Sequence, residues 1–400
     1  TVEKNYLLVR YSGQFSVENL NDTKQLEKNE DIFVQVHEFE TGEITCAYEP
    51  YLTMICDGFR RYMTGTFEEF METCDVYYLH RPVLLGYFNQ DNTGREEIIL
   101  LDEVAYEQER MLAALERMLC AIADRHPVLF VLNRFQLASK STMQLTARFL
   151  KCENCNIGLV LGVSDIQAMP EFLVPDWEML YETLDDGSKI YHIGNSGRKK
   201  EETIDDEKYV DYGSEKVYRK LQNMVEFLDF DQAAYYLETI ERKIKFDNLL
   251  VDDAARFRMW LLFVKVSILR QDIPKALEIC EDLEKIHLAG KEEECAYEQD
   301  YLIATAYMYQ GKLKEALEMA GETYRIAGKM SDDYRMFLSE LLEAKIQMSG
   351  WYNIFFCAQD VKIKESLIQN LIRYNYRNHL AHVYIYAYDN KPEIVKKANQ

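Results

Sequence analysis

VLFVLNRFQLAS, residues 128–139, is the segment that decides the fold. It opens with five apolar residues, turns polar at Asn133 and Arg134, and ends at Ser139, ahead of a helical pattern that continues to Leu150. A short apolar run that ends in turn residues is typical of a buried strand, and serine is a preferred helix N-cap. The segment therefore predicts a strand, a turn and a helix, capped by Ser139 or Ser141.

Similar apolar runs occur elsewhere in the first half of the chain. They lie at residues 6–9, 32–36 and 158–162, and residues 107–124 have the pattern of a long amphipathic helix. Apolar β-rich runs that alternate with helical patterns indicate parallel βαβ units. We therefore expect residues 1–198 to form an α/β domain.

The composition limits the number of domains and the classes of partner. A chain of 400 residues is longer than one hydrophobic core usually supports, so we expect two domains. Its net charge of -22 would repel nucleic-acid phosphates and anionic lipid, so we expect no direct nucleic-acid binding and no membrane association. The nine cysteines are odd in number and scattered through apolar stretches, as reduced thiols of a cytoplasmic protein would be.

A polar, charged segment separates the α/β pattern from a purely helical one. It contains the predicted linker, residues 199–213, and residues 214–400 then have helical periodicity with short turns. Three turns are each followed by a small residue, Ala233, Ala276 or Ala316, at intervals of 43 and 40 residues. The order of helix, turn, small residue and helix resembles a tetratricopeptide (TPR) array.

The order of elements over residues 5–200 resembles another family, the STAND branch of the P-loop NTPases. This branch includes MalT-type and LuxR-type bacterial regulators. The strand of residues 128–132, followed by a helix and the strand of residues 157–162, is similar to the family's Walker B region. The resemblance implies an α/β P-loop-NTPase-like domain followed by an all-α TPR-like helical repeat domain. It also implies acidic residues at the end of the strand, where this chain has Asn133 and Arg134.

The phosphate-binding loop of that family is also altered. Of its glycines only Gly13 remains. Phe15 stands where the last glycine would be, Ser16 where the lysine would be, and Val17 where the threonine with the magnesium-binding hydroxyl would be. These residues do not supply the groups that cradle phosphate and hold Mg²⁺. The resemblance therefore implies a pseudo-NTPase without catalytic residues, nucleotide cofactor or bound metal.

The cysteines and histidines have no recognisable metal-site spacing. Cys152 and Cys155 form a single CxxC between a helix and a strand, and the nearest histidines in the sequence, His126 and His192, lack ligand spacing. A thioredoxin-like motif would follow a strand instead of preceding one. We interpret the two cysteines as ordinary packed or partly exposed thiols.

Aromatic side chains in the helical part are candidates for ligand contacts. Helical repeats hold peptides, small molecules or partner domains on their surfaces. Core packing accounts for most aromatic positions. The residues that we single out for contact with a protein or small-molecule effector are Trp260, Tyr301, Tyr307, Tyr309 and Tyr334.

These patterns predict a regulatory, signal-transducing module of a cytoplasmic bacterial protein such as a transcriptional regulator. Because the chain begins at Thr1 without Met, we expect it to be part of a longer protein whose C-terminal output domain is missing here. Two alternatives stay open. One is a nucleotide-dependent STAND switch in which Arg10 or Arg134 replaces the absent lysine, and the other is a protein interaction scaffold.

Overall fold

The computed structural model divides the chain into two compact units. It describes residues 6–11, 32–40, 43–91, 103–152, 155–163, 169–185, 189–193, 211–247, 249–349 and 364–390. The boundary falls within helix α9, so that the described residues up to Tyr236 belong to the first unit and those from Leu237 belong to the second. Each unit is described by itself.

The first unit contains a parallel sheet. Its strands are β1 (Tyr6–Tyr11), β2 (Phe33–Glu38), β3 (Val128–Asn133), β4 (Ile157–Val163) and β5 (Lys189–Ile193). Their order is β2-β3-β4-β1-β5, and every neighbouring pair is parallel. All four apolar runs noted in the sequence lie in strands, because a parallel strand covered by helices is apolar over most of its length.

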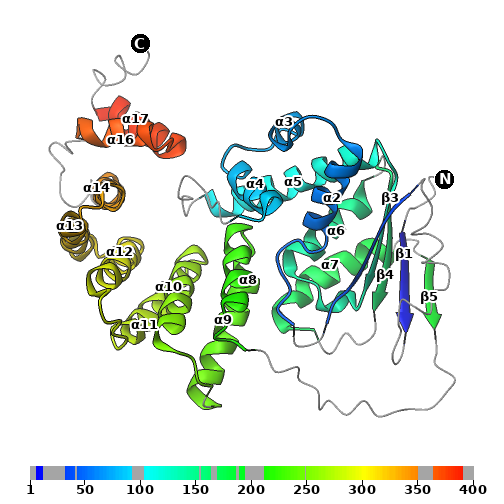
Figure 1. Cartoon of the computed structure of the whole chain (residues 1–400), viewed down its shortest axis with the longest axis horizontal. Helices are drawn as coiled ribbons and strands as arrows, with labels where there is room; N and C mark the ends of the chain where they lie inside the picture. Colours follow the sequence, from blue (N-terminus) through cyan, green and yellow to red (C-terminus); the bar gives the residue numbers. More distant parts are fainter. Residues whose placement is uncertain are drawn as a thin grey trace. The chain divides into compact units, whose positions relative to one another are not determined.

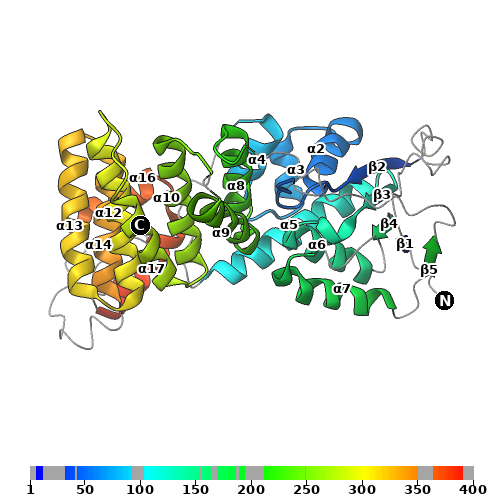
Figure 2. The same ribbon diagram turned by 90° about the horizontal axis from the view of Figure 1, so that it is seen from below.

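Helices make up most of the first unit. They are α2 (Tyr51–Tyr62), α3 (Phe67–Thr73), α4 (Arg81–Asn89), α5 (Val104–Ala123), α6 (Lys140–Lys151), α7 (Val174–Asp185) and α8 (Glu215–Glu226), followed by the first part of α9 (Phe230–Phe246), with the 3-10 turns η3 (Phe135–Leu137) and η5 (Glu171–Leu173). Figures 1 and 2 show α2, α5, α6 and α7 on one side of the sheet. The buried faces of these helices supply much of the core of the unit.

Local sequence explains how these helices begin and pack. The Ser139 side chain accepts a hydrogen bond from the Thr142 backbone N–H and caps α6, one of the two caps expected from the sequence. The Tyr51 ring of α2 packs edge-on against Phe130 of β3, with ring centroids 4.7 Å apart. A Cβ at Gly58 of α2 would lie 2.8 Å from the Ile122 side chain of α5, so glycine allows these two helices to approach closely.

Helix α8 and the start of α9 are held to the first unit by polar contacts. Lys220 Nζ donates to the Ile44 carbonyl at 2.7 Å and pairs with Glu43 at 2.9 Å. At the N-terminus of α6, Ser141 N donates to the buried Asp229 carboxylate at 3.1 Å, and Lys140 Nζ lies 2.5 Å from Asp231. Burial raises the pKa of Asp229, while the hydrogen bonds from Ser141 oppose that rise.

The described part of the second unit is helical. Besides the rest of α9, its helices are α10 (Asp253–Leu269), α11 (Ile273–Leu283), α12 (Glu292–Gln310), α13 (Leu313–Met330), α14 (Asp333–Met348), α16 (Glu365–Arg373) and α17 (Arg377–Asn390). Consecutive helices contact each other from α10 to α14. Ala276 and Ala316, each in the first turns of a helix, are fully buried, as is Ala304 on the facing side of α12. Small side chains at these positions let neighbouring helices pack closely.

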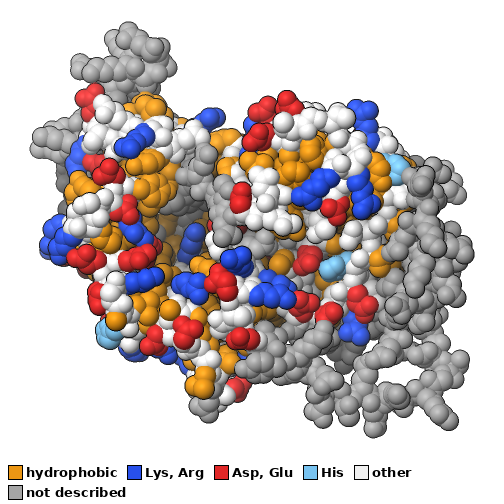
Figure 3. Space-filling view, viewed as in Figure 1, with side chains coloured by type: hydrophobic (Ala, Val, Ile, Leu, Met, Phe, Trp, Pro, Cys, Tyr) orange, Lys and Arg blue, Asp and Glu red, His pale blue; other side chains and the backbone are white. Residues whose placement is uncertain are grey.

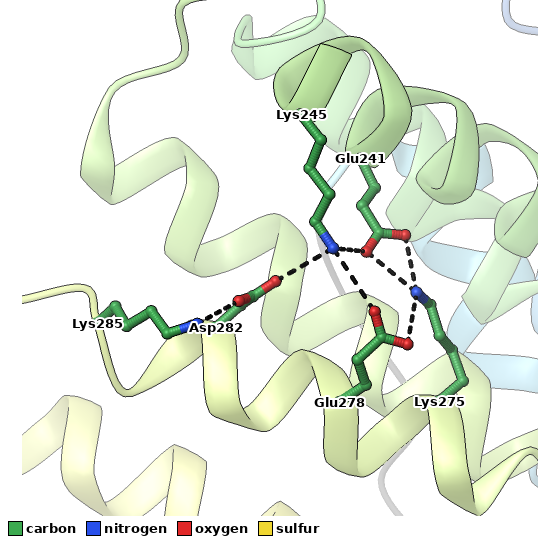
Figure 4. Close-up of polar contacts among 6 residues, drawn as sticks. All are labelled: Glu241, Lys245, Lys275, Glu278, Asp282 and Lys285. Atoms are coloured by element: carbon green, nitrogen blue, oxygen red, sulfur yellow. Dashed lines mark hydrogen bonds and ion pairs between the residues drawn. The ribbon is translucent and has the colours of Figure 1, made fainter.

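A network of charged side chains joins α9 to α11 within the second unit (Figure 4). The nearly buried Glu241 carboxylate accepts from Lys245 at 2.7 Å and from Lys275 at 2.9 Å. Lys245 also reaches Glu278 and Asp282, each at 3.5 Å. Because Glu241 is only 9% exposed, both lysines are needed to offset the loss of its hydration.

The expected fold class is wrong. Among the described residues, the protein is 70% helical and has 15 α-helices, whereas the strands have only five to seven residues each. The protein is therefore mainly α-helical, and not a sizeable α/β P-loop-NTPase-like domain followed by an all-α TPR-like helical repeat domain. The physical reason lies between β2 and β3, where α2, α3, α4 and α5 bury their apolar faces and no described residue forms a strand.

Parts of the sequence prediction fall on residues that the structure does not describe. In the predicted linker, residues 199–213, only the last three are described, and they lead into α8. The TPR resemblance of the second unit stays a prediction. No helix in the described part of the chain is both long and apolar enough to cross a membrane.

Candidate functional site: a tyrosine-lined pocket in the second unit

Three helices of the second unit enclose a cavity of about 540 Å³. Helix α10 contributes Lys265, Ile268 and Leu269, and α12 and α14 contribute the aromatic and charged side chains. Most of the lining is apolar, with a few charged and hydroxyl groups. Ligand pockets of small molecules commonly have this size and mixture.

Helix α12 forms the aromatic wall of the pocket. Tyr297, Tyr301, Thr305 and Tyr309 line the cavity at intervals of four residues, which places them on one face of the helix. The rings of Tyr297 and Tyr301 stack with centroids 6.0 Å apart and an interplanar angle of 22°. Thr305 Oγ1 donates to the Tyr301 carbonyl at 2.8 Å, which fixes this hydroxyl against the helix.

Helix α14 forms the opposite wall. Tyr334, Leu338 and Leu342 follow one another at four-residue intervals, and Lys345 lies near the end of the same helix. The Tyr334 hydroxyl is 2.8 Å from that of Tyr376, so its ring is held in place from outside the cavity. The face of α14 that carries Tyr334, Leu338 and Leu342 is therefore largely apolar, and Lys345 adds a cation near the end of the helix.

Arg335 connects the two walls. Its Nη2 lies 2.7 Å from Glu298 Oε1 on α12, and its Nη1 lies 3.2 Å from Asp332. The guanidinium also lies over the Tyr297 ring, 5.2 Å from the centroid, and the Tyr297 hydroxyl donates to the Arg335 carbonyl at 2.9 Å. Partial burial lowers the pKa of Arg335, but the bonds and charges of Glu298, Asp332 and Glu294 more than offset this and raise it.

The charged groups around the cavity leave it slightly basic. Lys265, Arg335 and Lys345 carry three positive charges, and Glu298 and Asp332 carry two negative ones. This balance is the opposite of the whole chain, whose net charge is -22. Arg335 is engaged with both acids, whereas the exposed Lys265 has no ion-pair partner within the described part of the chain.

The structure brings three of the five predicted contact residues together. Tyr301, Tyr309 and Tyr334 all line the cavity. Trp260 is 3% exposed and packs edge-on against Phe263, so it belongs to the core. Tyr307 packs against the core cluster that contains Ala304 and Ala316, outside the pocket lining. A role of any of these residues in binding stays a prediction.

Asn133 and Arg134 lie at the end of β3, as expected from the sequence. Asn133 is buried, and its side-chain oxygen accepts a hydrogen bond from the Arg134 backbone N–H at 3.0 Å. Arg134 has a left-handed backbone (φ 52°), and its Nε lies 3.5 Å from Glu38 Oε1 at the end of β2. The amide thus shapes the turn and the guanidinium faces an acid.

The other predicted positions of the altered nucleotide motif cannot be placed. The residues Gly13, Phe15, Ser16 and Val17 lie outside the part of the chain that the structure describes. Their proximity to the end of β3 stays a prediction.

The sequence reasoning missed the polar residues of the pocket. Lys265, Glu298 and Arg335 were not singled out, although Tyr297, Tyr301 and Tyr309 are separated by multiples of four residues in the sequence. That spacing marks one face of a helix. Which helices face it is decided by tertiary packing, so the charged partners on α10 and α14 could not be identified from periodicity.

Comparisons of the chain with protein-family models, with curated proteins and with solved structures found no match. The resemblance to STAND proteins stays a prediction. What the protein binds has to be inferred from its own residues.

Proposed function

We propose that the protein is a non-catalytic regulatory module of the cytoplasm that senses a small anionic, partly aromatic molecule through the pocket of α10, α12 and α14. The observation that carries the proposal is the apolar, tyrosine-lined cavity with a surplus positive charge inside an acidic protein. The protein would transmit the state of this pocket to a partner or an output domain.

The shape and chemistry of the lining indicate the ligand class. A cavity of about 540 Å³ fits a molecule of metabolite or drug size. The stacked rings of Tyr297 and Tyr301 and the side chain of Tyr334 favour a planar or aliphatic body, since aromatic faces bury large apolar areas. Lys265 favours a carboxylate or phosphate on the ligand, because attraction between opposite charges strengthens as water leaves the pocket.

The position of the pocket also supports a regulatory role. Its walls come from α10, α12 and α14, which are separated in the chain by α11 and α13. A ligand that contacts all three helices stabilises the one packing arrangement in which they meet. Binding would therefore shift the second unit toward that arrangement, which is what a sensor requires.

The residues at the end of β3 support the part of the proposal that the protein is non-catalytic. A Walker B strand holds Mg²⁺ through a carboxylate at its end, but at this position Asn133 offers an amide that is already bonded to the Arg134 backbone. The Arg134 guanidinium is turned toward Glu38. We therefore propose that the first unit does not hydrolyse nucleotide and serves as a platform for the sensing unit.

A thermal-shift screen of amphipathic carboxylates and phosphates, followed by calorimetric titration, tests the sensing proposal. At a concentration of about 100 Kd, a true ligand stabilises the protein by about 2.7 kcal/mol. Tyr301→Ala and Lys265→Ala should each weaken binding at least about tenfold, whereas Tyr324→Ala on α13, outside the pocket, should not change it.

Binding that is equal in Tyr301→Ala, Lys265→Ala and Tyr324→Ala would show that the pocket is not the site. A screen in which only neutral or cationic molecules stabilise the protein would contradict the proposed ligand chemistry. If the three variants differ in unfolding free energy, each affinity is compared at a temperature where all are folded.

A further inference from the structure

Three cysteine side chains of the first unit lie together. Cys120 is in the last turn of α5, Cys152 directly follows α6, and Cys155 lies two residues before β4. Their Sγ atoms all lie within 4.8 Å of one another. None of the three forms a disulfide, and Cys155 is buried whereas the other two are half-buried. Cys120 was absent from the sequence-based interpretation, because only the packing of α5 beside α6 brings it to the CxxC pair.

The sulfur spacing is close to what a zinc ion requires. Zinc binds thiolates at about 2.3 Å in tetrahedral geometry, so neighbouring sulfurs lie about 3.8 Å apart. The three Sγ atoms would have to approach one another by no more than about 1 Å. Rotation of cysteine side chains is enough for a change of this size.

Two helix ends favour a cation at the same place. Helix α5 ends at Ala123, one turn after Cys120, and α6 ends at Lys151, immediately before Cys152. The last carbonyl groups of a helix carry partial negative charge, which attracts cations. Three thiolates alone would be repelled by these helix ends, and a divalent cation would offset two of their three negative charges.

A cavity borders the cluster at Cys152. It has a volume of about 570 Å³, and Cys152, Glu116 and Arg148 line it. The Glu116 carboxylate is engaged by Arg148 Nη1 at 2.9 Å, so it is not the obvious fourth ligand. The cavity offers water or a small molecule that position instead.

We infer that Cys120, Cys152 and Cys155 form a three-thiolate Zn²⁺ site whose fourth position opens to the cavity. This assignment replaces the sequence-based interpretation of packed thiols. When Zn²⁺ binds, the three thiols release three protons and become thiolates. Three thiolates and one divalent cation give the site a net charge of -1. Three protein ligands with one open position is the arrangement of zinc sites that bind or activate a further molecule.

Cobalt substitution in the full chain tests the site directly. Reduced, metal-free protein is titrated with Co²⁺, and the thiolate-to-cobalt charge-transfer absorption is followed before and after addition of Zn²⁺. We expect one Co²⁺ per chain, an absorption intensity that corresponds to three thiolates, and complete displacement by Zn²⁺. Cys120→Ser, Cys152→Ser and Cys155→Ser should each lower the zinc affinity at least about 100-fold, since even groups that only orient ligands contribute 10–100-fold.

A matched control and a second measurement keep the inference testable if a variant fails to fold. Cys56→Ser removes a buried thiol of α2, outside the cluster, and should leave zinc binding unchanged. In the unmodified chain, Zn²⁺ should protect Cys120, Cys152 and Cys155 from alkylation but leave the half-buried Cys46 and Cys295 reactive, as read by peptide mass spectrometry.

Three results would overturn the three-thiolate site. One is cobalt binding without charge-transfer absorption. Another is unchanged zinc affinity in folded Cys120→Ser, which would leave at most a two-cysteine site. The third is alkylation of all three thiols at the same rate with and without zinc.

Discussion

Arg335 Nη2 of α14 lies 2.7 Å from Glu298 Oε1 of α12, and Arg335 Nε donates to the same oxygen at 3.2 Å. Both contacts join the two walls of the tyrosine-lined pocket. Arg335 is 23% exposed and Glu298 is 39% exposed, so the pair is half-buried, and two guanidinium nitrogens contact the same carboxylate oxygen. The width of the pocket therefore depends on this contact.

Glu298→Gln should lower the free energy of unfolding by about 1–2 kcal/mol, because the guanidinium loses a charged acceptor and keeps only Asp332 and Glu294. Urea unfolding measures the change. Glu294→Gln is the control, since its contact with Arg335 is 3.5 Å long and Glu294 is 49% exposed, and it should change stability by less than about 0.5 kcal/mol. Equal effects of the two variants would contradict the assigned role of Glu298.

The pair His80 and Glu107 is a second buried contact whose loss should be measurable. His80 Nε2 lies 3.1 Å from Glu107 Oε2, both side chains are fully buried, and Arg110 approaches the other carboxylate oxygen at 2.7 Å. Glu107→Ala should lower the free energy of unfolding by about 1–3 kcal/mol, because the buried His80 imidazole loses its 3.1 Å contact with the carboxylate and Arg110 loses an acceptor. Glu109→Ala, on the same helix but 61% exposed, should cost less than about 1 kcal/mol in the same urea titration.

The strands and the helix after β3 could be predicted from the sequence because their signals are local. The apolar run of residues 128–132 forms most of β3, and Ser139 caps α6 as its position indicated. The balance between sheet and helix could not be predicted. The segment of residues 51–123 has helical periodicity as well as many apolar residues, and only packing shows that its helices supply much of the core of the first unit.

The candidate sites could be predicted less well than the strands, because they depend more on tertiary packing. The tyrosine face of α12 was visible as a regular spacing, but the cavity that it lines together with Lys265 and Arg335 is formed by three helices that are separated in the chain. Cys120 meets Cys152 and Cys155 for the same reason. Periodicity indicates which residues share one face of a helix, but it does not indicate which neighbouring helix that face packs against.

The charge network of Glu241 should make the packing of α9 on α11 sensitive to single substitutions. Lys275→Met keeps the aliphatic stem and removes the charge that Glu241 accepts at 2.9 Å, so we expect a loss of about 1–3 kcal/mol. Lys285→Met is the control, because Lys285 is 72% exposed and contacts only the edge of the network at Asp282. A double-mutant cycle of Lys275→Met with Glu241→Gln should give a coupling energy of at least about 0.5 kcal/mol. Strict additivity would show that the two charges do not stabilise each other.

Nucleotide turnover should be absent in the full chain. With ATP and Mg²⁺, phosphate release should stay at background in the unmodified protein and in Arg134→Ala, because neither Asn133 nor Arg134 can supply a magnesium-binding carboxylate. Calorimetric titration of ATP with Mg²⁺ accompanies the assay. Release above background that disappears in Arg134→Ala would favour the nucleotide-dependent switch instead.

Asp300 should make the stability of the second unit depend on pH. Burial on α12, together with the negative charges of Glu322 and Glu284, raises the pKa of Asp300 from 3.8 to about 6. The folded state therefore binds the proton more tightly than the unfolded state, so stability falls as the pH rises from about 4 to about 6 and stays at the lower value above that range. Asp300→Asn removes the ionisable group. It should stabilise the protein by about 1 kcal/mol at pH 7 and should have no stabilising effect at pH 4. The value at pH 7 takes into account that the side chain is partly exposed to solvent. Urea unfolding at pH 4, 5, 6 and 7 measures the difference, with the exposed Glu318→Gln on α13 as the control. A gain from Asp300→Asn that is the same at all four values would mean that ionisation of Asp300 is not its cause.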